Sequence, residues 1–358
     1  MKIAIDISQI VYGTGVSIYT ENLVKSLLKI DHNNEYVLFG GTLRRKRDIV
    51  SIFPGAKVFP IPPTLADIVW NKLHIFPIEK LIGDVDVFHA SDWTEPPSTA
   101  FKVTTVHDLA PFLYPNLFPR DLIRNIVDTH KSKLALARTE SKRVIVPTQA
   151  TKKDLIKLGF KEEVVRVIPE AVSSDFKRVD AFSIERAKSK YGLYGKYMLA
   201  VGLDPRKNTD RIIKAFEHAS AGRDVKLVFV GTPKYMKVQE NRNIRILGRV
   251  PTNLLPALYS GADGLIYPSL YEGFGLPILE AMACGCPVIT SNISSMAEVA
   301  GNAACLVDPY DTDSITDAIE KIIRGSKSFV DKGYKRVKDF SWEDTARKTL
   351  DVYKEVGK

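Results

Sequence analysis

The sequence predicts an α/β protein of two domains, each an open parallel sheet with helices between its strands. Short apolar runs rich in β-branched residues alternate with longer amphipathic segments, which is typical of such sheets. The alternation runs to residue 172 and starts again at residue 195. The chain has 358 residues, which is longer than a domain with a single hydrophobic core usually is. We therefore expect two Rossmann-like domains, 1–172 and 173–341, joined in the polar stretch 173–194.

The first domain is expected to begin with a strand, a glycine turn and a helix. In that helix Val16, Tyr19, Leu23 and Leu27 recur at helical spacing. The stretch from Leu117 to Arg143 also has a helical pattern. The expected strands are 2–8, 35–40, 56–61, 84–90, 102–110, a strand from Lys142, and 164–172.

The second domain repeats this alternation. Its expected strands are 195–202, 225–231, 243–250, 264–269, 287–292 and 304–308. Amphipathic helices are expected at 208–220 and 314–325, and the chain closes with a helix over 341–356.

Charge and cysteine content narrow the class of protein. The net charge of +9 is spread, with 23 Lys and Arg against 19 Asp and Glu up to residue 170 and 28 against 23 after it, unlike a nucleic-acid arm. The basic segment Leu117–Arg143 is either a solvated face or a contact with an anionic membrane leaflet. The odd count of three cysteines, Cys284, Cys286 and Cys305, favours a reducing compartment, and Cys284 and Cys286 are expected to be small buried thiols. No signal stretch or membrane span is apparent, so we expect a cytoplasmic protein.

One stretch, YEGFGLPILEAMACGCPVIT (271–290), carries the strongest signal. Gly273 and Gly275 allow a sharp turn, and Pro277 suits the first turn of a helix. Free N–H groups at such a helix start favour a phosphate. Glu272 and Glu280 flank that site and would suit neutral hydroxylated groups on either side of it. A sugar, a diphosphate and a nucleoside have this order of chemistry.

The stretch resembles the signature of the retaining glycosyltransferases of family 4. Other motifs of that family follow in the same order along nearly the whole chain: YGTGVSIYTENL, TTVHDLAP, VGLDPRKNTDRIIKAF, ILGRV, SGADGLIYPS and FSWEDTARKTLDVY. The resemblance implies the GT-B fold, in which two Rossmann-like domains face each other across a cleft and a C-terminal helix, here 342–358, crosses back to the first domain. It also implies a nucleotide sugar held mostly by the second domain, an acceptor on the first, and no cofactor or metal.

The resemblance assigns roles to residues of the second domain. Glu272 would hold hydroxyls of the transferred sugar, and Glu280 would hold the ribose. The backbone of Gly273, Phe274, Gly275 and Leu276 would meet the diphosphate. The loop VGLDPRK places Arg206 and Lys207 where they would stabilise the departing diphosphate. It lacks the early arginine of the commoner family pattern and is similar to the PRKN form of relatives assigned to mannosyl transfer. Gly248, Arg249 and Val250 would flank the base.

In the first domain the same resemblance points to two turns. Gly13 and Gly15 would let the backbone approach the diphosphate. His107 would contact the donor sugar, and Asp108 would either orient the imidazole or cap the turn. Both residues end a predicted strand, where ligands bind in open α/β sheets.

Several alternatives compete with this interpretation. An NAD-dependent oxidoreductase needs a Gly-x-Gly-x-x-Gly turn, but Ile18 stands at the third position. A nucleotide or nucleic-acid binding module would show one basic face. An epimerase of the same fold is the nearest rival in chemistry. The Asp-Val-Asp at 84–86 imitates a metal site but opens a strand. We expect a mannosyltransferase using GDP-mannose, with a UDP-sugar as the second possibility, acting on a glycan or lipid-linked acceptor.

Overall fold

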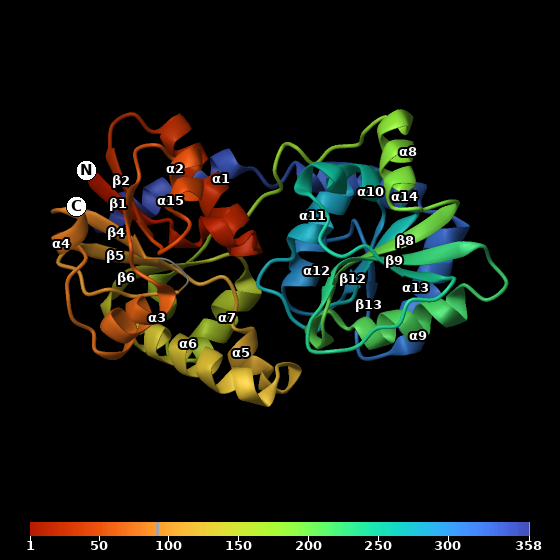
Figure 1. Cartoon of the computed structure of the whole chain (residues 1–358), viewed down its shortest axis with the longest axis horizontal. Coiled ribbons are helices and arrows are strands. Elements are labelled where there is room, and N and C mark those ends of the chain that lie inside the picture. Colours follow the sequence, from red (N-terminus) through yellow and green to blue (C-terminus); the bar gives the residue numbers. More distant parts are fainter. Residues whose placement is uncertain (91–92, 358) are drawn as a thin grey trace. The chain divides into compact units, whose positions relative to one another are not determined.

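The computed structural model describes residues 1–90 and 93–357, and Figure 1 colours its helices and strands along the sequence. Internal contacts divide the chain into two compact units. Unit 1 comprises 1–115, 120–170 and the C-terminal segment from Trp342, and unit 2 comprises 116–119 and 171–341. Each unit contains one parallel sheet.

Unit 1 has a seven-stranded sheet in the order β3-β2-β1-β4-β5-β6-β7. β4 is buried at all four of its residues, as expected for a central parallel strand covered on both faces. In register, Ile3 of β1 lies between Tyr36 and Val87. The strands are β1 (Lys2–Asp6), β2 (Glu35–Gly41), β3 (Lys57–Phe59), β4 (Val87–Ala90), β5 (Phe101–Thr105), β6 (Ser141–Val146) and β7 (Val165–Val167).

Helices cover both faces of this sheet (Figure 1). α1 begins with a capping box between Thr14 and Ser17. The helices of unit 1 are η1 (Ser8–Tyr12), α1 (Gly15–Ile30), α2 (Lys46–Ile52), α3 (Pro63–Ala66), the π-helix η2 (Asp67–Lys72), α4 (Glu79–Ile82), α5 (Ala110–Leu113), α6 (Arg120–Glu140), α7 (Gln149–Lys157), η4 (Glu162–Val164) and α15 (Trp342–Val356), and η3 (Pro115–Leu117) passes from unit 1 into unit 2.

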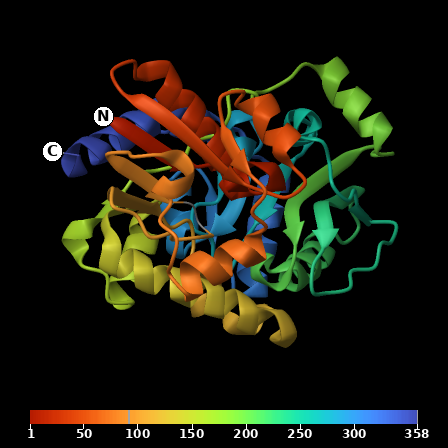
Figure 2. The same cartoon turned by 60° about the vertical axis from the view of Figure 1, so that its left-hand side comes forward.

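The C-terminal helix belongs to the same unit as the first strand. α15 packs against α1, and Figure 2 shows it running beside the N-terminal elements. Its Thr345 hydroxyl donates to the Pro169 carbonyl at 2.7 Å. Its Glu355 carboxylate accepts from Arg143 at 2.7 Å and from Arg166 at 2.9 Å. These contacts join the end of the chain to β6 and β7 of unit 1.

Unit 2 has a six-stranded sheet in the order β10-β9-β8-β11-β12-β13. Its strands are β8 (Lys196–Leu203), β9 (Val225–Pro233), β10 (Ile244–Ile246), β11 (Gly264–Tyr267), β12 (Val288–Ser291) and β13 (Cys305–Val307). Its helices are α8 (Ala181–Lys190), η5 (Pro205–Lys207), α9 (Thr209–Ala219), η6 (Thr252–Leu254), α10 (Leu255–Gly261), α11 (Leu276–Ala283), α12 (Ser294–Ala300), α13 (Thr312–Arg324) and α14 (Lys327–Val337).

One hydrophobic core of unit 2 lies between its sheet and the helices α9 and α13. Phe216 of α9 and Ile319 of α13 are fully buried against Phe229 of β9. Burying side chains of this size stabilises the fold by about 1.5–3 kcal/mol each relative to leaving them exposed. In the described part of the chain, no helix is both long and apolar enough to cross a bilayer.

Several strands end earlier than the sequence pattern predicts. The expected strand 102–110 stops at Thr105, because the Asp108 carboxylate accepts from Ala110 N at 3.1 Å and α5 begins there. The expected strand 164–172 stops at Val167. In both cases the extra apolar residues lie in the loop beyond the carboxyl end of the sheet.

Candidate functional site

Both sheets reverse their strand order at one point, between β1 and β4 in unit 1 and between β8 and β11 in unit 2. In open α/β sheets ligands bind beyond the carboxyl ends of the strands at such a switch point. The loops that follow β8 and β11 contain Arg206, Lys207 and Glu272. The fold therefore places three of the predicted residues at the ligand-binding edge of unit 2.

These three side chains are in direct contact. Lys207 Nζ lies 2.6 Å from Glu272 Oε1, and Arg206 Nη1 lies 2.7 Å from Glu272 Oε2. Arg206 also donates to the Tyr271 carbonyl at 3.1 Å. The Glu272 side chain is nine-tenths buried, so this is a desolvated cluster of two cations and one carboxylate.

The strand ends hold Lys207 in place. Gly202 has a φ of +85°, and a Cβ there would lie 3.0 Å from Lys207 Cγ, so the lysine stem crosses over this glycine. Asp204 caps the short helix η5 by accepting from Lys207 N at 3.0 Å. The Tyr267 hydroxyl accepts a hydrogen bond from Lys207 Nζ, which also lies 4.6 Å from the centre of that ring.

The charges of the cluster shift its proton equilibria. Burial alone would raise the pKa of the Glu272 carboxyl, but the adjacent Arg206 and Lys207 outweigh burial and lower it to about 2. Burial lowers the pKa of the Lys207 ammonium, against the attraction of Glu272. Glu272 is therefore ionised at neutral pH, so both of its oxygens act as hydrogen-bond acceptors.

The glycine turn leads directly into α11. Gly275 has a φ of +100° and occupies the N-cap position, where no side chain caps the helix. Pro277 lies in the first turn, as the sequence predicts. Phe274 and Leu276 are buried on either side of Gly275. In the first turn Pro277 has no N–H, and Ile278 N donates to the Gly275 carbonyl at 2.9 Å.

Glu280 lies one turn into α11 and differs from Glu272 in its environment. Its Oε2 accepts from the Tyr259 hydroxyl at 2.8 Å. Burial raises the pKa of the Glu280 carboxyl to about 7, with the Tyr259 hydrogen bond and Lys207 opposing the rise. The two motif glutamates thus differ strongly in proton affinity, because only Glu272 contacts two cations.

The predicted base-flanking residues follow β10. Gly248 has a φ of +65°, and its carbonyl accepts from Gly231 N at 2.8 Å, which ties the loop to the end of β9. Val250 is buried and Arg249 is exposed. These positions lie at the same carboxyl edge of the sheet as the charged cluster.

In unit 1, His107 and Asp108 follow β5. His107 Nδ1 lies 3.0 Å from Glu170 Oε1, and both side chains are buried. Asp108 caps the turn into α5 through Ala110 N. Of the two roles considered for Asp108, the structure therefore provides the cap, and it gives the imidazole a carboxylate partner, Glu170, that the sequence did not suggest.

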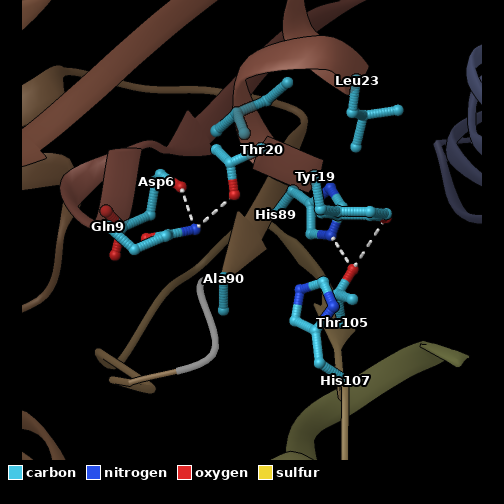
Figure 3. Close-up of a pocket in the computed structure, with 10 residues that line it drawn as sticks. Asp6, Gln9, Tyr19, Thr20, Leu23, His89, Ala90, Thr105 and His107 are labelled. Atoms are coloured by element: carbon cyan, nitrogen blue, oxygen red, sulfur yellow. Dashed lines mark hydrogen bonds between the residues drawn. The ribbon is translucent and has the colours of Figure 1, made fainter. Parts of the chain in front are cut away.

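A small polar cavity of about 10 Å³ adjoins His107 (Figure 3). The Thr105 hydroxyl bonds His89 Nε2 at 2.7 Å and the Tyr19 hydroxyl at 3.4 Å. The Tyr19 ring meets His107 edge-on, with centroids 4.5 Å apart. Burial, with the nearby charges of His107 and Lys133, lowers the pKa of the His89 imidazole to about 3, so His89 is a neutral structural group.

Gly13 and Gly15 also lie in unit 1, between η1 and the start of α1. Gly13 has a φ of +65°. A Cβ added at Gly15 would meet no atom within 4 Å, and both residues are exposed. The backbone of this turn is therefore open to a ligand.

Sequence reasoning missed several residues that support the site. Glu170, Tyr259 and Tyr267 each bond a predicted side chain. Asn208 adopts the left-handed conformation, and its buried amide donates to the carbonyls of Pro268 and Pro309 at 3.1 and 2.6 Å. Tyr267 and Glu170 each lie at or just after a strand end, which was the one available signal for them.

Two family profiles match the chain. Residues 13–176 match the profile described as Glycosyltransferase Family 4, and residues 183–337 match Glycosyl transferases group 1. The chain is 31% identical over 286 residues to O-antigen chain mannosyltransferase B of Escherichia coli, covering 75% of this chain and 74% of that protein. It is 33% identical over 229 residues to O-antigen chain mannosyltransferase RfbU of Salmonella typhimurium, covering 62% and 60%.

A match to a longer protein and two solved structures complete the comparison. The chain is 28% identical over 270 residues to Serotype-specific mannosyltransferase WbdA of Escherichia coli but spans only 33% of that protein. It superposes on Anabaena Alr3699/HepE in complex with UDP-glucose with a TM-score of 0.74 and 16% identity, covering 99% and 100% of the two chains. For WaaG, a glycosyltransferase involved in lipopolysaccharide biosynthesis, the TM-score is 0.71 with 17% identity and coverage of 98% and 99%.

Proposed function

The chain belongs to glycosyltransferase family 4, and from this premise we propose that it is a retaining, metal-independent hexosyltransferase. Its donor is GDP-mannose, and its acceptor is a glycan or lipid-linked glycan of a cell-surface polysaccharide. The observation that carries the proposal is the buried cluster of Arg206, Lys207 and Glu272 at the switch point of unit 2.

The cluster suits departure of a diphosphate. When the bond between the anomeric carbon and the diphosphate oxygen breaks, the electron pair goes to the diphosphate. Arg206 and Lys207 supply fixed positive charge where that negative charge develops, in a site from which water is largely excluded. The positive end of the α11 helix dipole adds to this.

Each end of the donor then meets a carboxyl group. Ionised Glu272 accepts hydroxyls of the transferred hexose, and its charge favours the cationic character that the sugar ring gains in the transition state. Glu280, one turn further along α11, accepts from the ribose hydroxyls. His107, oriented by Glu170, contacts the sugar from the first domain.

The choice of donor and acceptor rests on the relatives. O-antigen mannosyltransferases match most of the chain, which supports mannose as the transferred sugar and GDP-mannose as its donor. A lipid-linked acceptor would bring the protein to the anionic cytoplasmic leaflet, where exposed cations of the basic segment Leu117–Arg143, such as Lys131, would make that contact.

One calorimetric series tests the proposal. GDP, UDP and ADP are titrated into the full chain, and transfer and donor hydrolysis are then assayed with the corresponding sugars, with and without EDTA. We expect GDP to bind most tightly and EDTA to leave turnover unchanged. Activity lost with EDTA and restored by a divalent cation would contradict the metal-independent reaction.

A UDP-sugar is the second candidate donor, supported by the similar fold of a protein solved with UDP-glucose. Tighter binding of UDP than GDP would select it. An epimerase is the third candidate, and it would convert the nucleotide sugar without any acceptor.

A further inference from the structure

Unit 1 contains a second pocket that none of the steps above uses. Its volume is about 180 Å³, and its walls are mostly apolar. It lies beyond the carboxyl ends of β1 and β4, at the switch point of the first sheet, with η2 and α6 contributing further walls. Ligands bind at this position in open α/β sheets.

Three aromatic side chains line the pocket. Tyr12 and Trp93 are 43% and 50% exposed, and their ring centres lie 6.1 Å apart at an angle of 39°. Trp70 is buried and donates its indole N–H to the Phe76 carbonyl at 3.1 Å. Two large, partly exposed rings and one buried ring thus line the same pocket.

The pocket is fixed before any ligand binds. The buried Asn71 amide donates to the Trp93 carbonyl at 3.0 Å and to Asp67 Oδ1 at 2.9 Å. Asn71 Oδ1 accepts from Glu95 N at 2.9 Å. These bonds tie the loop that carries Trp93 to η2, a π-helix, and π-helical turns are frequent at functional sites. A preformed pocket binds without the cost of ordering its walls.

The pocket also has hydrogen-bond acceptors. Gln9 lines it and is 4% exposed, and its Nε2 donates to the Asp6 carbonyl and to Thr20 (Figure 3). In the described part of the chain its Oε1 is buried with no hydrogen-bond partner. A buried acceptor without a donor is costly, and a ligand hydroxyl would remove that cost. On the η2 wall, the Asp67 carboxylate is a second acceptor.

We propose that this pocket binds one pyranose ring of the acceptor glycan. The apolar C–H face of the ring packs on Trp93 and Tyr12, and its hydroxyls donate to Gln9 Oε1 and Asp67. The volume lies below the roughly 300–1,000 Å³ of pockets for drug-sized ligands, which suits one ring better than a long lipid chain. The assignment of this ring to an acceptor rests on the proposed glycosyl transfer.

Saturation-transfer NMR of the full chain tests this inference. The probes are methyl α-D-mannopyranoside, methyl α-D-galactopyranoside and methyl N-acetyl-β-D-glucosaminide, with farnesyl phosphate as the lipid probe. At least one pyranoside is expected to bind saturably, and Trp93→Ala is expected to weaken its binding at least about tenfold, equivalent to about 1.4 kcal/mol. Trp93→Phe retains an aromatic face and should bind within about threefold of the parent.

Controls separate the pocket from the fold and from the proposed function. Phe101→Ala removes an aromatic side chain of similar exposure, 43%, from the same unit and should leave pyranoside binding unchanged. If Trp93→Ala does not fold, Tyr12→Ala is a second variant that removes an aromatic ring from the pocket and should weaken pyranoside binding. Binding of farnesyl phosphate alone, or pyranoside binding that ignores both ring substitutions, would overturn the inference. If neither GDP nor UDP binds while pyranoside binding depends on Trp93, the transferase proposal fails and the sugar pocket stands.

Discussion

The carboxyl edges of the two sheets have the same topology and opposite chemistry. Each sheet has its first strand beside its fourth, and the strands then follow in the same order. At the edge of unit 2 a carboxylate contacts two cations at 2.6 and 2.7 Å. At the edge of unit 1 lie the exposed rings of Tyr12 and Trp93 and the imidazole of His107.

The difference shows that topology fixes where a ligand binds, while the loop residues fix what binds. The cations of unit 2 suit an anionic diphosphate. The rings of unit 1 and the acceptors Gln9 Oε1 and Asp67 suit a neutral, hydroxylated molecule. The proposed function needs both, because its donor is charged and its proposed glycan acceptor is largely neutral.

The carboxyl edge of the unit 2 sheet, with Arg206, Lys207 and Glu272, is called the charged edge below. Removing its carboxylate is expected to have the largest effect. Glu272→Ala should lower kcat for transfer by about 10²–10³-fold, because charge that stabilises the transition state is lost. Calorimetric binding of the nucleoside diphosphate should stay near the parent value, since Arg206 and Lys207 remain. Normal turnover in this variant would refute the sugar-binding role of Glu272.

The same carboxylate also balances two buried cations. Glu272→Gln keeps the shape of the side chain but should lower the free energy of unfolding by about 3–5 kcal/mol, the cost of breaking a buried ion pair. Because nucleoside diphosphate affinity is expected to be unchanged, GDP should stabilise parent and variant by the same amount. Thermal unfolding with and without GDP checks the point, and a variant as stable as the parent without GDP would contradict it.

A smaller effect is expected from Lys207→Ala. Loss of a charge-assisted hydrogen bond to the diphosphate should weaken nucleotide binding by about 2 kcal/mol, or roughly 30-fold. Calorimetry with GDP measures it. Lys214, an exposed residue of α9, provides the matched control, and Lys214→Ala should bind as the parent does. Unchanged GDP affinity in Lys207→Ala would contradict the proposed contact between Lys207 and the diphosphate.

Much of the fold and of the charged edge could be predicted from the sequence. Strand and helix periods are local, so the alternation marks the elements, and the glycine turn with Pro277 marks the start of α11. The roles expected for the edge residues came from the family resemblance, which connects Lys207 with Glu272 although they lie 65 residues apart in the chain. The strand ends were predicted less well, because an apolar loop residue such as Leu109 has the same pattern as a strand residue.

Some contacts between residues far apart in the chain could not be predicted from the sequence. Glu170 is 63 residues from His107, and Tyr259 is 21 residues from Glu280. No period or spacing connects such pairs, so the sequence suggested the adjacent Asp108 as one possible partner of His107. The aromatic pocket was missed for the same reason, because Tyr12, Trp70 and Trp93 converge only when η1, η2 and the loop after β4 are folded together.

The raised pKa of Glu280, about 7, predicts a pH dependence for the charged edge. The ionised carboxyl accepts ribose hydroxyls, so GDP affinity should increase as pH rises from 6 to 8. Between pH 4.5 and 7 the unfolded chain releases this proton and the folded chain keeps it, so stability should decrease with rising pH by up to about 3 kcal/mol. Glu280→Gln should flatten both profiles, and parallel slopes in parent and variant would exclude Glu280.

The smallest expected effect concerns His89 in unit 1. Here stability should rise with pH, opposite to the change expected from Glu280. His89 has a pKa lowered to about 3 from 6.5, so as pH falls below 6.5 the unfolded chain gains a proton that the folded chain does not, and stability should decrease.

Tyr353→Phe removes the hydroxyl that bonds His89 Nδ1 at 2.6 Å and should lower the free energy of unfolding by about 1–2 kcal/mol at neutral pH. All three tryptophans, Trp70, Trp93 and Trp342, lie in unit 1, so fluorescence-detected urea unfolding reports on this unit. A variant as stable as the parent across pH 5 to 8 would show that His89 does not depend on Tyr353.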